Sequence, residues 1–352
     1  MRQAENRRPE LFRQVTAACI LGCAGPALLK EEAAFFRDVD PWGFILFGRN
    51  VETPTQVRVL ADALRAAVGR PDAPILIDQE GGRVQRLGPP HWRRYPPAGA
   101  YASLADAGLR REMTRLGARL IAHDLAAVGI NVDCAPVLDV PAPGAHDIIG
   151  DRAYGEEVEE IASLGRAAAE ALMAGAVLPM IKHIPGHGRA MADSHLHLPV
   201  VEASLAELEA RDFAPFKALA DMPMAMTAHV VYAAVDARRP ATTSPAVIER
   251  VIRGVIGFEG LLISDDLSMK ALTGDFTQRA RDSLFAGCDL VLHCNGGMAE
   301  MKAVAKGTGP MTARAAERAA AALARLPKAP EPFDAREARR RFDAALGDRW
   351  AA

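Results

Sequence analysis

Ala176-Val177-Leu178-Pro179-Met180-Ile181-Lys182-His183 is a short apolar run that ends abruptly in two titratable side chains. A run of this kind, bounded by turn-forming residues, is typical of a buried β-strand whose C-terminal end opens into a polar loop. Seven further runs of the same kind occur along the chain, at 15–22, 42–47, 74–79, 129–135, 223–229, 260–265 and 288–294. Four of the eight runs end in a polar residue, namely Gln79, His183, His229 and Asp265, and polar residues lie in or shortly after the others. The pattern predicts eight buried strands.

Segments with helical periodicity separate these strands, and several begin with recognisable capping residues. Thr53-Pro54-Thr55-Gln56 places a capping threonine ahead of a proline, Ser204-Leu205-Ala206-Glu207 is a capping box, and Ser244-Pro245 opens a third segment. Strands that alternate with helices form a parallel sheet, and eight repeats favour an α/β fold of the (β/α)8 TIM-barrel type. An open doubly wound sheet is the alternative, but no Gly-x-Gly-x-x-Gly motif follows the first strand.

Composition and length limit the classes of protein that fit. The 352 residues contain no linker-like stretch, so we expect a single barrel domain over 1–352, with C-terminal helices at about 311–346 packed outside the barrel. The net charge of −2 provides no basic field for a polyanion, which argues against nucleic acid as a partner. Five cysteines without paired spacing argue against a disulfide framework and a zinc knuckle.

The N-terminal residues lack the apolar core of a signal peptide, and no window is long enough for a membrane span. We therefore expect a cytoplasmic protein that does not associate with a membrane. A monomer is the default expectation for its oligomeric state.

Polar residues at the strand ends are the candidate active site, because barrel enzymes build their sites at the C-terminal ends of the strands. We expect these residues to converge on one mouth. They are Asp78, Glu80, Arg83 and Arg86 after the third strand, Asp151 and Arg152 after the fourth, Lys182 through His195 after the fifth, His229 after the sixth, Asp265 and Asp266 after the seventh, and His293 and Asn295 after the eighth.

Two neighbouring acids end the seventh strand. A carboxylate at the tip of a buried strand is rigid and partly desolvated, as a nucleophile or a general base requires. Because side chains alternate along a strand, one of Asp265 and Asp266 should face the mouth while the other points elsewhere. The alternative interpretation is a cap for the next helix, which fits Asp266 better than Asp265.

Asp193-Ser194-His195 places a carboxylate and an imidazole two residues apart, close enough for the acid to orient the ring and raise its basicity. Such a pair exchanges protons near neutral pH, and the alternative is a structural pair that holds the loop in place.

His183 and His187 could instead suggest a metal site. However, Pro185 and Gly186 between them forbid a regular helical turn, and no ready carboxylate or cysteine completes a ligand set, so we expect no metal.

Three motifs, in this order along the chain, resemble those of bacterial single-domain β-N-acetylhexosaminidases of glycoside hydrolase family 3, the kind that acts in peptidoglycan recycling. The motifs are Ile77-Asp78-Gln79-Glu80-Gly81-Gly82-Arg83-Val84-Gln85-Arg86, Lys182-His183-Ile184-Pro185-Gly186-His187-Gly188 with Asp193-Ser194-His195, and Ser264-Asp265-Asp266-Leu267-Ser268-Met269. The resemblance runs over nearly the whole chain.

The resemblance implies a role for each matching position. Asp265 would be the nucleophile that attacks the anomeric carbon, and His195, paired with Asp193, would be the acid/base. The side chains that would hold the N-acetylglucosamine ring are Asp78, Arg86, Arg152, Lys182 and His183. Retaining glycosidases usually employ two carboxylates, so here a histidine would replace the second one. The family works without metal or cofactor.

The expected reaction is therefore hydrolysis of terminal, non-reducing β-linked N-acetylglucosamine by double displacement. The expected substrate is a small saccharide or a muropeptide such as GlcNAc-1,6-anhydro-MurNAc, and chitin fragments and other glycosides stay open. Three alternatives also stay open: an N-acetylglucosaminide phosphorylase, a catalytically silent sugar-binding or regulatory barrel, and a metal-dependent hydrolase. The phosphorylase stays open because a neutral histidine tolerates an incoming phosphate.

Overall fold

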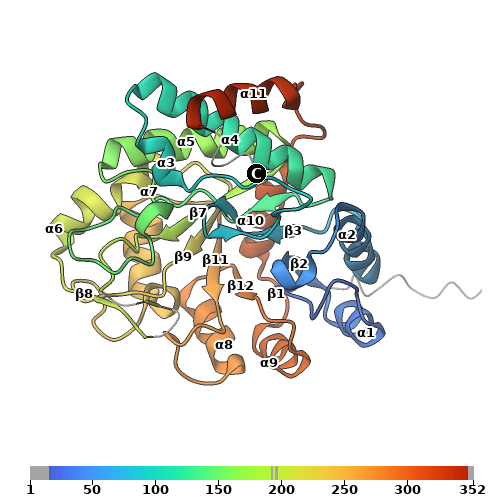
Figure 1. Cartoon of the computed structure of the whole chain (residues 1–352). Helices are drawn as coiled ribbons and strands as arrows, with labels where there is room; N and C mark the ends of the chain where they lie inside the picture. The colour runs from blue at the N-terminus through green and yellow to red at the C-terminus, as the bar shows by residue number, and fades with distance from the viewer. Residues whose placement is uncertain (1–15, 192, 195–196, 348–352) are drawn as a thin grey trace, which may run out of the picture.

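The computed structural model describes residues 16–191, 193–194 and 197–347, and its centre is a closed barrel of eight parallel strands (Figure 1). Around the barrel the order is β1-β2-β3-β6-β7-β9-β11-β12, and β12 pairs with β1. The strands are β1 (Ala17–Leu21), β2 (Pro41–Leu46), β3 (Ile75–Ile77), β6 (Val132–Asp133), β7 (Leu178–Ile184), β9 (Met224–Thr227), β11 (Leu261–Asp266) and β12 (Leu290–His293). Each predicted run overlaps one of these strands, with ends that differ by a few residues, so the predicted (β/α)8 barrel is confirmed.

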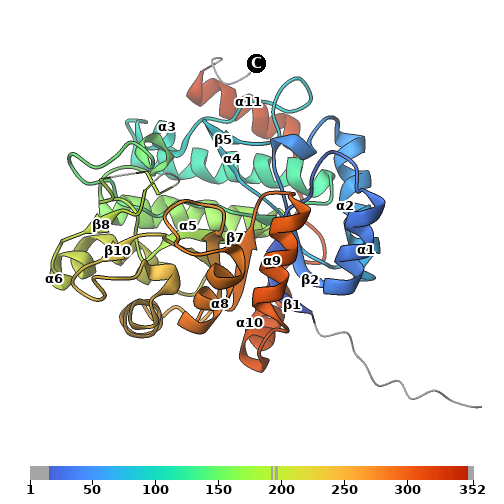
Figure 2. The ribbon, with the colours of Figure 1, turned by 90° about the horizontal axis from the view of Figure 1, so that it is seen from below.

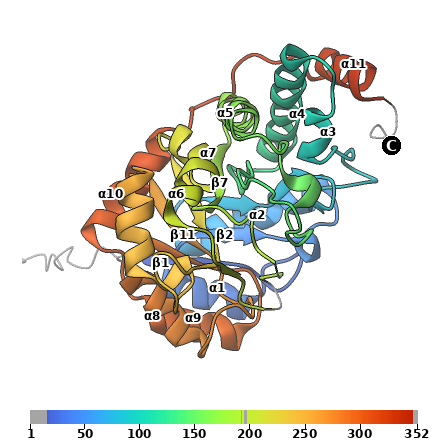
Figure 3. The ribbon, with the colours of Figure 1, turned by 90° about the vertical axis from the view of Figure 1, so that its left-hand side faces the viewer.

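Helices follow the strands and surround the barrel (Figures 1 and 3). They are α1 (Lys30–Val39), α2 (Pro54–Val68), α3 (Ala98–Ala102), α4 (Ala107–Ala127), α5 (Val158–Ala174), α6 (Leu205–Glu207), α7 (Ala214–Ala218), the π-helix η5 (Val247–Val255), α8 (Phe276–Ala286), α9 (Met298–Thr308), α10 (Ala313–Ala324) and α11 (Ala335–Leu346). Figure 2 shows the two long helices α4 and α5 lying side by side. Among the described residues, no helix combines the length and apolarity needed to cross a membrane.

The predicted capping residues begin the helices that follow them. The side chain of Thr53 accepts a hydrogen bond from the backbone of Gln56 at the start of α2. Ser204 and Glu207 form a reciprocal capping box at α6. These caps satisfy backbone N–H groups that a helix leaves without intrahelical partners, and so they fix where each helix begins.

Both faces of the barrel strands are buried, which explains their nearly continuous apolar sequences. In β1, Ala18 and Ile20 belong to the cluster inside the barrel, whereas Cys19 and Leu21 pack in the layer between strands and helices. The same alternation places Leu290 and Leu292 of β12 inside the barrel.

Short strand pairs lie in the loops beyond the C-terminal ends of the barrel strands. β4 (Gln79–Gly81) pairs with β5 (Val84–Gln85), and β8 (Val200–Val201) pairs with β10 (Val231–Tyr232) (Figure 2). They give local order to the loops that follow β3, β7 and β9.

The two C-terminal helices occupy different places. Ala319 and Ala322 of α10 join the cluster inside the barrel, and Met311 N donates to Thr16 O, 3.1 Å away, next to the start of β1. Helix α10 therefore covers the end at which the strands begin. Helix α11 lies against α4 (Figure 1). The ring of its buried Phe342 packs edge-on against Tyr101 at a centroid distance of 6.1 Å.

We expect Phe342→Ala to lower the free energy of unfolding by about 3–5 kcal/mol, because it removes a fully buried ring and leaves a cavity. Urea unfolding followed by circular dichroism measures the change. Phe285→Ala is the matched control, because Phe285 is 82 % exposed and its removal should cost less than about 0.5 kcal/mol. If Phe342→Ala lowered the free energy of unfolding as little as Phe285→Ala does, the packing of the Phe342 ring would add nothing measurable to stability.

Candidate active site

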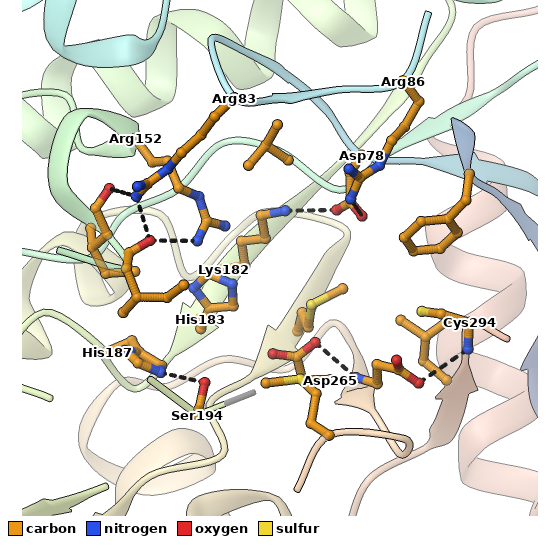
Figure 4. A pocket seen from close by; sticks show the side chains of 18 of the residues that line it. Asp78, Arg83, Arg86, Arg152, Lys182, His183, His187, Ser194, Asp265 and Cys294 are labelled. Carbon is orange, nitrogen blue, oxygen red and sulfur yellow. Dashed lines mark hydrogen bonds and ion pairs between the residues drawn. The ribbon is translucent and has the colours of Figure 1, made fainter. Parts of the chain in front are cut away.

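The C-terminal ends of the barrel strands surround a cavity of about 390 Å³ (Figure 4). Most of the predicted strand-end residues line it, so the predicted convergence on one mouth is found for these positions. They are Asp78, Arg83, Arg86, Arg152, Lys182, His183, His187, Ser194, Asp265, Asp266 and Asn295. Phe47, Met226, Met269 and Leu292 add apolar surface to the wall.

A buried ammonium group lies at one side of this cavity. Lys182, in β7, is 2 % exposed, and its Nζ lies 2.8 Å from Asp78 Oδ1 and 2.6 Å from Glu80 Oε1. Glu80 also accepts two hydrogen bonds from the Arg152 guanidinium, at 2.9 and 2.8 Å. The network joins the loop after β3, the end of β7 and the loop after β6, which lie far apart in the sequence.

Charge pairing outweighs desolvation in this network. Burial by itself would raise the pKa of each carboxyl group, but Lys182 and Arg152 lower the pKa of Glu80 to about 2. Lys182 and Arg86 likewise bring the pKa of Asp78 below its ordinary value. Burial would lower the pKa of Lys182, yet the two carboxylates raise it. All of these groups are therefore charged at neutral pH.

Arg86 extends the network toward the cavity. Its Nη2 donates to Asp78 Oδ2 over 3.2 Å, and its guanidinium lies 4.7 Å from the centre of the Phe47 ring. The buried Nε of Arg86 has no hydrogen-bond partner among the described residues. The Arg86 side chain lines the cavity beside Phe47.

Asp139 supports the wall of the cavity and was not singled out by the sequence. Its fully buried carboxylate accepts hydrogen bonds from His183 N (3.2 Å), His183 Nδ1 (2.6 Å) and His187 N (2.6 Å). Burial would raise the pKa of Asp139, but the neighbouring His183 ring lowers it. With Nδ1 bonded to Asp139, the ring of His183 has its tautomer and orientation fixed. The available signal was an acid a few residues after the strand predicted at 129–135.

The two acids at the end of β11 both line the cavity, so the prediction that one of them points elsewhere is wrong. Asp266 bonds to the surrounding chain, because its Oδ1 accepts from Ser268 N (3.0 Å) and Cys294 N (3.1 Å). It does not cap the next helix, since Asp275 caps α8. Asp265 Oδ1 accepts from Asp266 N over 2.7 Å, and its carboxylate projects into the cavity (Figure 4).

The loop that was predicted to carry the acid/base reaches the same cavity. Ser194 lines it, and its Oγ lies 2.9 Å from His187 Nε2. Burial lowers the pKa of His187 to about 4, so this ring is neutral. His195 lies outside the described residues, and its pairing with the partly buried Asp193 stays a prediction.

Gly188 in this loop is required by close packing. A Cβ at this position would lie 1.9 Å from the backbone oxygen of Val140, and Gly188 O accepts a hydrogen bond from Ala142 N over 3.0 Å. The loop after β7 is thereby held against the chain that follows β6.

Some of the strand-end candidates do not line the cavity, which corrects the expectation that all of them converge; they include Glu80, Asp151, His229 and His293. Glu80 lies behind the wall, paired with Lys182 and Arg152. His229 is fully buried and bonds to Thr242 Oγ1 (2.7 Å) and Asp266 O (3.0 Å), and burial lowers its pKa. His293 alternates with the inward-facing Leu292 and so points to the helix layer, where its ring packs edge-on against Phe276. Asp151 lines a neighbouring cavity, beside Arg83.

No three His, Cys, Asp or Glu side chains within the described ranges are grouped so as to hold a metal ion. All five cysteines are buried and free. The side chains that face the cavity are carboxylates, guanidiniums, an ammonium and imidazoles. This is the set of groups that hydrogen-bonds the hydroxyls of a sugar and that performs acid–base and nucleophilic chemistry.

A (β/α)8 barrel with such groups at its C-terminal mouth defines the class of barrel enzymes that act on polar, polyhydroxylated substrates. Within this class, residues 23–326 match the model of the glycosyl hydrolase family 3 N terminal domain. The chain belongs to glycosyl hydrolase family 3 and is a glycosidase of its β-N-acetylhexosaminidase group, as the three sequence motifs predicted.

Individual relatives support this assignment. A β-hexosaminidase from Methylococcus capsulatus is 42 % identical over 276 residues, covering 77 % of this chain and 80 % of its own. One from Alkalilimnicola ehrlichii is 40 % identical over 282 residues, covering 78 % and 80 %. Among solved structures, native NagZ from Neisseria gonorrhoeae superimposes with a TM-score of 0.81 at 33 % identity, covering 94 % of this chain and 96 % of its own.

The buried network makes stability depend on pH. The pKa of Glu80 is lowered from 4.5 to about 2 in the folded chain, so its contribution is complete above pH 4.5 and is lost as the pH falls toward 2. We expect Glu80→Gln to lower the free energy of unfolding by about 3 kcal/mol at pH 7 and by clearly less at pH 3. Urea unfolding at the two pH values measures the difference.

Glu31→Gln is the matched control, because the Glu31 side chain is 73 % exposed. Its effect on stability should be small at both pH values. If Glu80→Gln and the wild type differed by the same amount at pH 7 and pH 3, the ionised form of Glu80 would not be what stabilises the fold.

Proposed function

We propose that this protein hydrolyses terminal, non-reducing β-linked N-acetylglucosamine by double displacement, with Asp265 as the nucleophile. The observation that carries the proposal is that the Asp265 carboxylate projects into the same cavity as Asp78, Lys182 and His183 (Figure 4). A related structure from Neisseria gonorrhoeae, 32 % identical, holds N-trifluoroacetyl-D-glucosamine, which supports an N-acylated amino sugar as the ligand.

The sugar ring would be bound by the polar groups opposite Asp265. Asp78 accepts from ring hydroxyls, whereas Arg86, Arg152 and Lys182 donate. The orientation of His183 is fixed by its bond to Asp139, so that its Nε2 is available to the ligand. Because these groups are held by one another before a ligand arrives, little conformational entropy is lost when the sugar binds.

In the first half of the reaction, protonated His195 donates its proton to the glycosidic oxygen while Asp265 attacks the anomeric carbon. The bond to the leaving group breaks, and a glycosyl–aspartate bond forms. In the second half, neutral His195 takes a proton from water, and the water oxygen attacks the same carbon and releases Asp265. Asp193 stabilises the charged imidazolium.

For the physiological substrate we propose a muropeptide, GlcNAc-1,6-anhydro-MurNAc, processed by a cytoplasmic monomer during cell-wall recycling. The family resemblance supports this choice over a chitin fragment. A higher kcat/KM for the muropeptide than for chitobiose is the expected result of a direct comparison of the two substrates.

We expect Asp265→Asn to reduce turnover of an aryl N-acetyl-β-glucosaminide by at least about a thousandfold, because an amide cannot form the covalent intermediate. A 2-acetamido-sugar fluoride analogue, followed by peptide mapping, should label Asp265 in the wild type only. Asp106→Asn, at the exposed cap of α4, is the control that leaves turnover unchanged. Near-normal turnover of a folded Asp265→Asn variant would remove the nucleophile assignment.

His195→Ala should slow glycosides with poor leaving groups by about 10²–10⁴-fold, and activated aryl glycosides much less, because only a poor leaving group requires a proton. The readout is kcat/KM across a series of aryl glycosides of increasing leaving-group pKa. A steeper dependence in the variant supports the acid role, and equal losses along the series contradict it.

Release of free sugar, rather than sugar phosphate, in phosphate buffer separates hydrolysis from phosphorolysis.

A further inference from the structure

A second cavity, of about 290 Å³, opens among the loops beside the mouth. Its wall includes Leu198, Arg238, Arg239, Arg279, Asp282 and Phe285, and we call it the arginine pocket. Its wall is formed by the loops that follow β7, β9 and β11 and by helix α8, which contains Arg279, Asp282 and Phe285. These loops leave the C-terminal ends of the strands, the end at which the active-site cavity lies.

The arginine pocket adjoins the active-site cavity through Arg279. The Nη1 of this residue donates to Leu267 O (2.6 Å) and Met269 O (3.2 Å). The Met269 side chain lines the active-site cavity, whereas the guanidinium that holds its carbonyl group lines the arginine pocket. The segment after β11 therefore forms a common wall between the two cavities.

The charge of this pocket is predominantly positive. It is lined by three guanidinium groups and by one carboxylate, that of Asp282, which accepts a hydrogen bond from Gln278 Nε2 over 2.6 Å. Arg238 and Arg239 are exposed, and within the described part of the chain neither has an acidic partner within 4.0 Å. The Arg279 guanidinium donates hydrogen bonds to backbone carbonyl oxygens. It forms no ion pair with a carboxylate of the described residues.

Hydrogen bonds to Asp236 hold the turn that carries Arg238 and Arg239. The carboxylate of Asp236 accepts from the backbone N–H groups of Arg238 (3.0 Å) and Arg239 (3.3 Å), and from Ser244 Oγ (2.7 Å). Asp236 thus fixes the backbone from which both guanidiniums extend. A fixed turn lowers the entropy that is lost when these side chains bind a ligand.

The position of this pocket relates it to the leaving group, an argument that rests on the proposed function. The segment that begins with Asp265 lines both cavities: Asp265 and Met269 face the active-site cavity, and Ala271 and Thr273 face the arginine pocket. The sugar would lie at Asp265, so a leaving group that extends from it along this segment would reach the arginine pocket.

We propose that the arginine pocket binds the leaving-group side of the substrate and favours aglycones that carry a carboxylate. Guanidinium groups bind carboxylates through paired, charge-assisted hydrogen bonds. Leu198 and the 82 % exposed Phe285 supply apolar contact for the remainder of the aglycone. The cavity that Arg83, Arg94 and Asp151 line is less suited to binding a carboxylate. Its Arg83 already lies 3.7 Å from Asp151 and 3.9 Å from Asp147.

The test compares two aryl N-acetyl-β-glucosaminides of similar leaving-group acidity, a neutral 4-nitrophenyl glycoside and an anionic 3-carboxy-4-nitrophenyl glycoside. The readout is the ratio of kcat/KM for the anionic substrate to that for the neutral one. We expect the double variant R238Q/R239Q to lower this ratio by about threefold to tenfold, as the loss of two exposed charge contacts implies. Added NaCl should lower the ratio in the wild type and leave it nearly constant in the variant.

R94Q/R115Q is the matched control, because it removes two exposed guanidiniums outside the arginine pocket, one of them in the other cavity. Its ratio should equal that of the wild type. An unchanged ratio in R238Q/R239Q, or an equal fall in both variants, would overturn the inference while leaving the proposed function intact. Failure of the wild type to cleave even the neutral glycoside would remove the proposed function itself, and the inference with it.

Discussion

The buried ammonium of Lys182 is the constraint on which the mouth of the barrel depends. Removing an ion from water costs several kcal/mol, and that cost is offset only when the partners are close and correctly placed. Asp78 and Glu80 meet this condition at 2.8 and 2.6 Å, and Arg152 completes the charge balance of Glu80. Because Lys182 lies at the end of β7 and its partners follow β3 and β6, one set of ion pairs fixes two loops relative to a barrel strand.

The carboxylates around the cavity consequently serve different purposes. Glu80, Asp139 and Asp266 bond to other parts of the chain and hold Lys182, His183 and the end of β12 in place. Asp265 instead projects into the cavity from the tip of β11, between these fixed groups (Figure 4). A site arranged in this way places the Asp265 carboxylate within a preorganised polar environment, and such environments are a main source of electrostatic stabilisation in enzymes.

Sequence patterns predicted the strands and most of the mouth, because an apolar run bounded by turns is a local property. They did not predict Asp139 or the structural role of Glu80, since both depend on partners that fold in from distant strands. His293 was misplaced because the direction of a side chain depends on the register of β12, in which Leu292 faces inward. Asp265 and Asp266 both reach the cavity because the pairing of β11 with β12 shifts register between Ile263 and Asp266, which interrupts strict alternation.

The barrel separates the chemistry from the recognition of whatever the sugar is attached to. The groups that would act on the sugar lie at strand ends or next to them, where ion pairs and buried hydrogen bonds allow little movement. The arginine pocket is lined by loops after β7, β9 and β11 and by α8, and its Arg238, Arg239 and Phe285 side chains are exposed. Residues there can change without disturbing Lys182 or Asp139. A barrel of this kind can therefore keep one reaction and alter its preference for leaving groups through a few surface side chains.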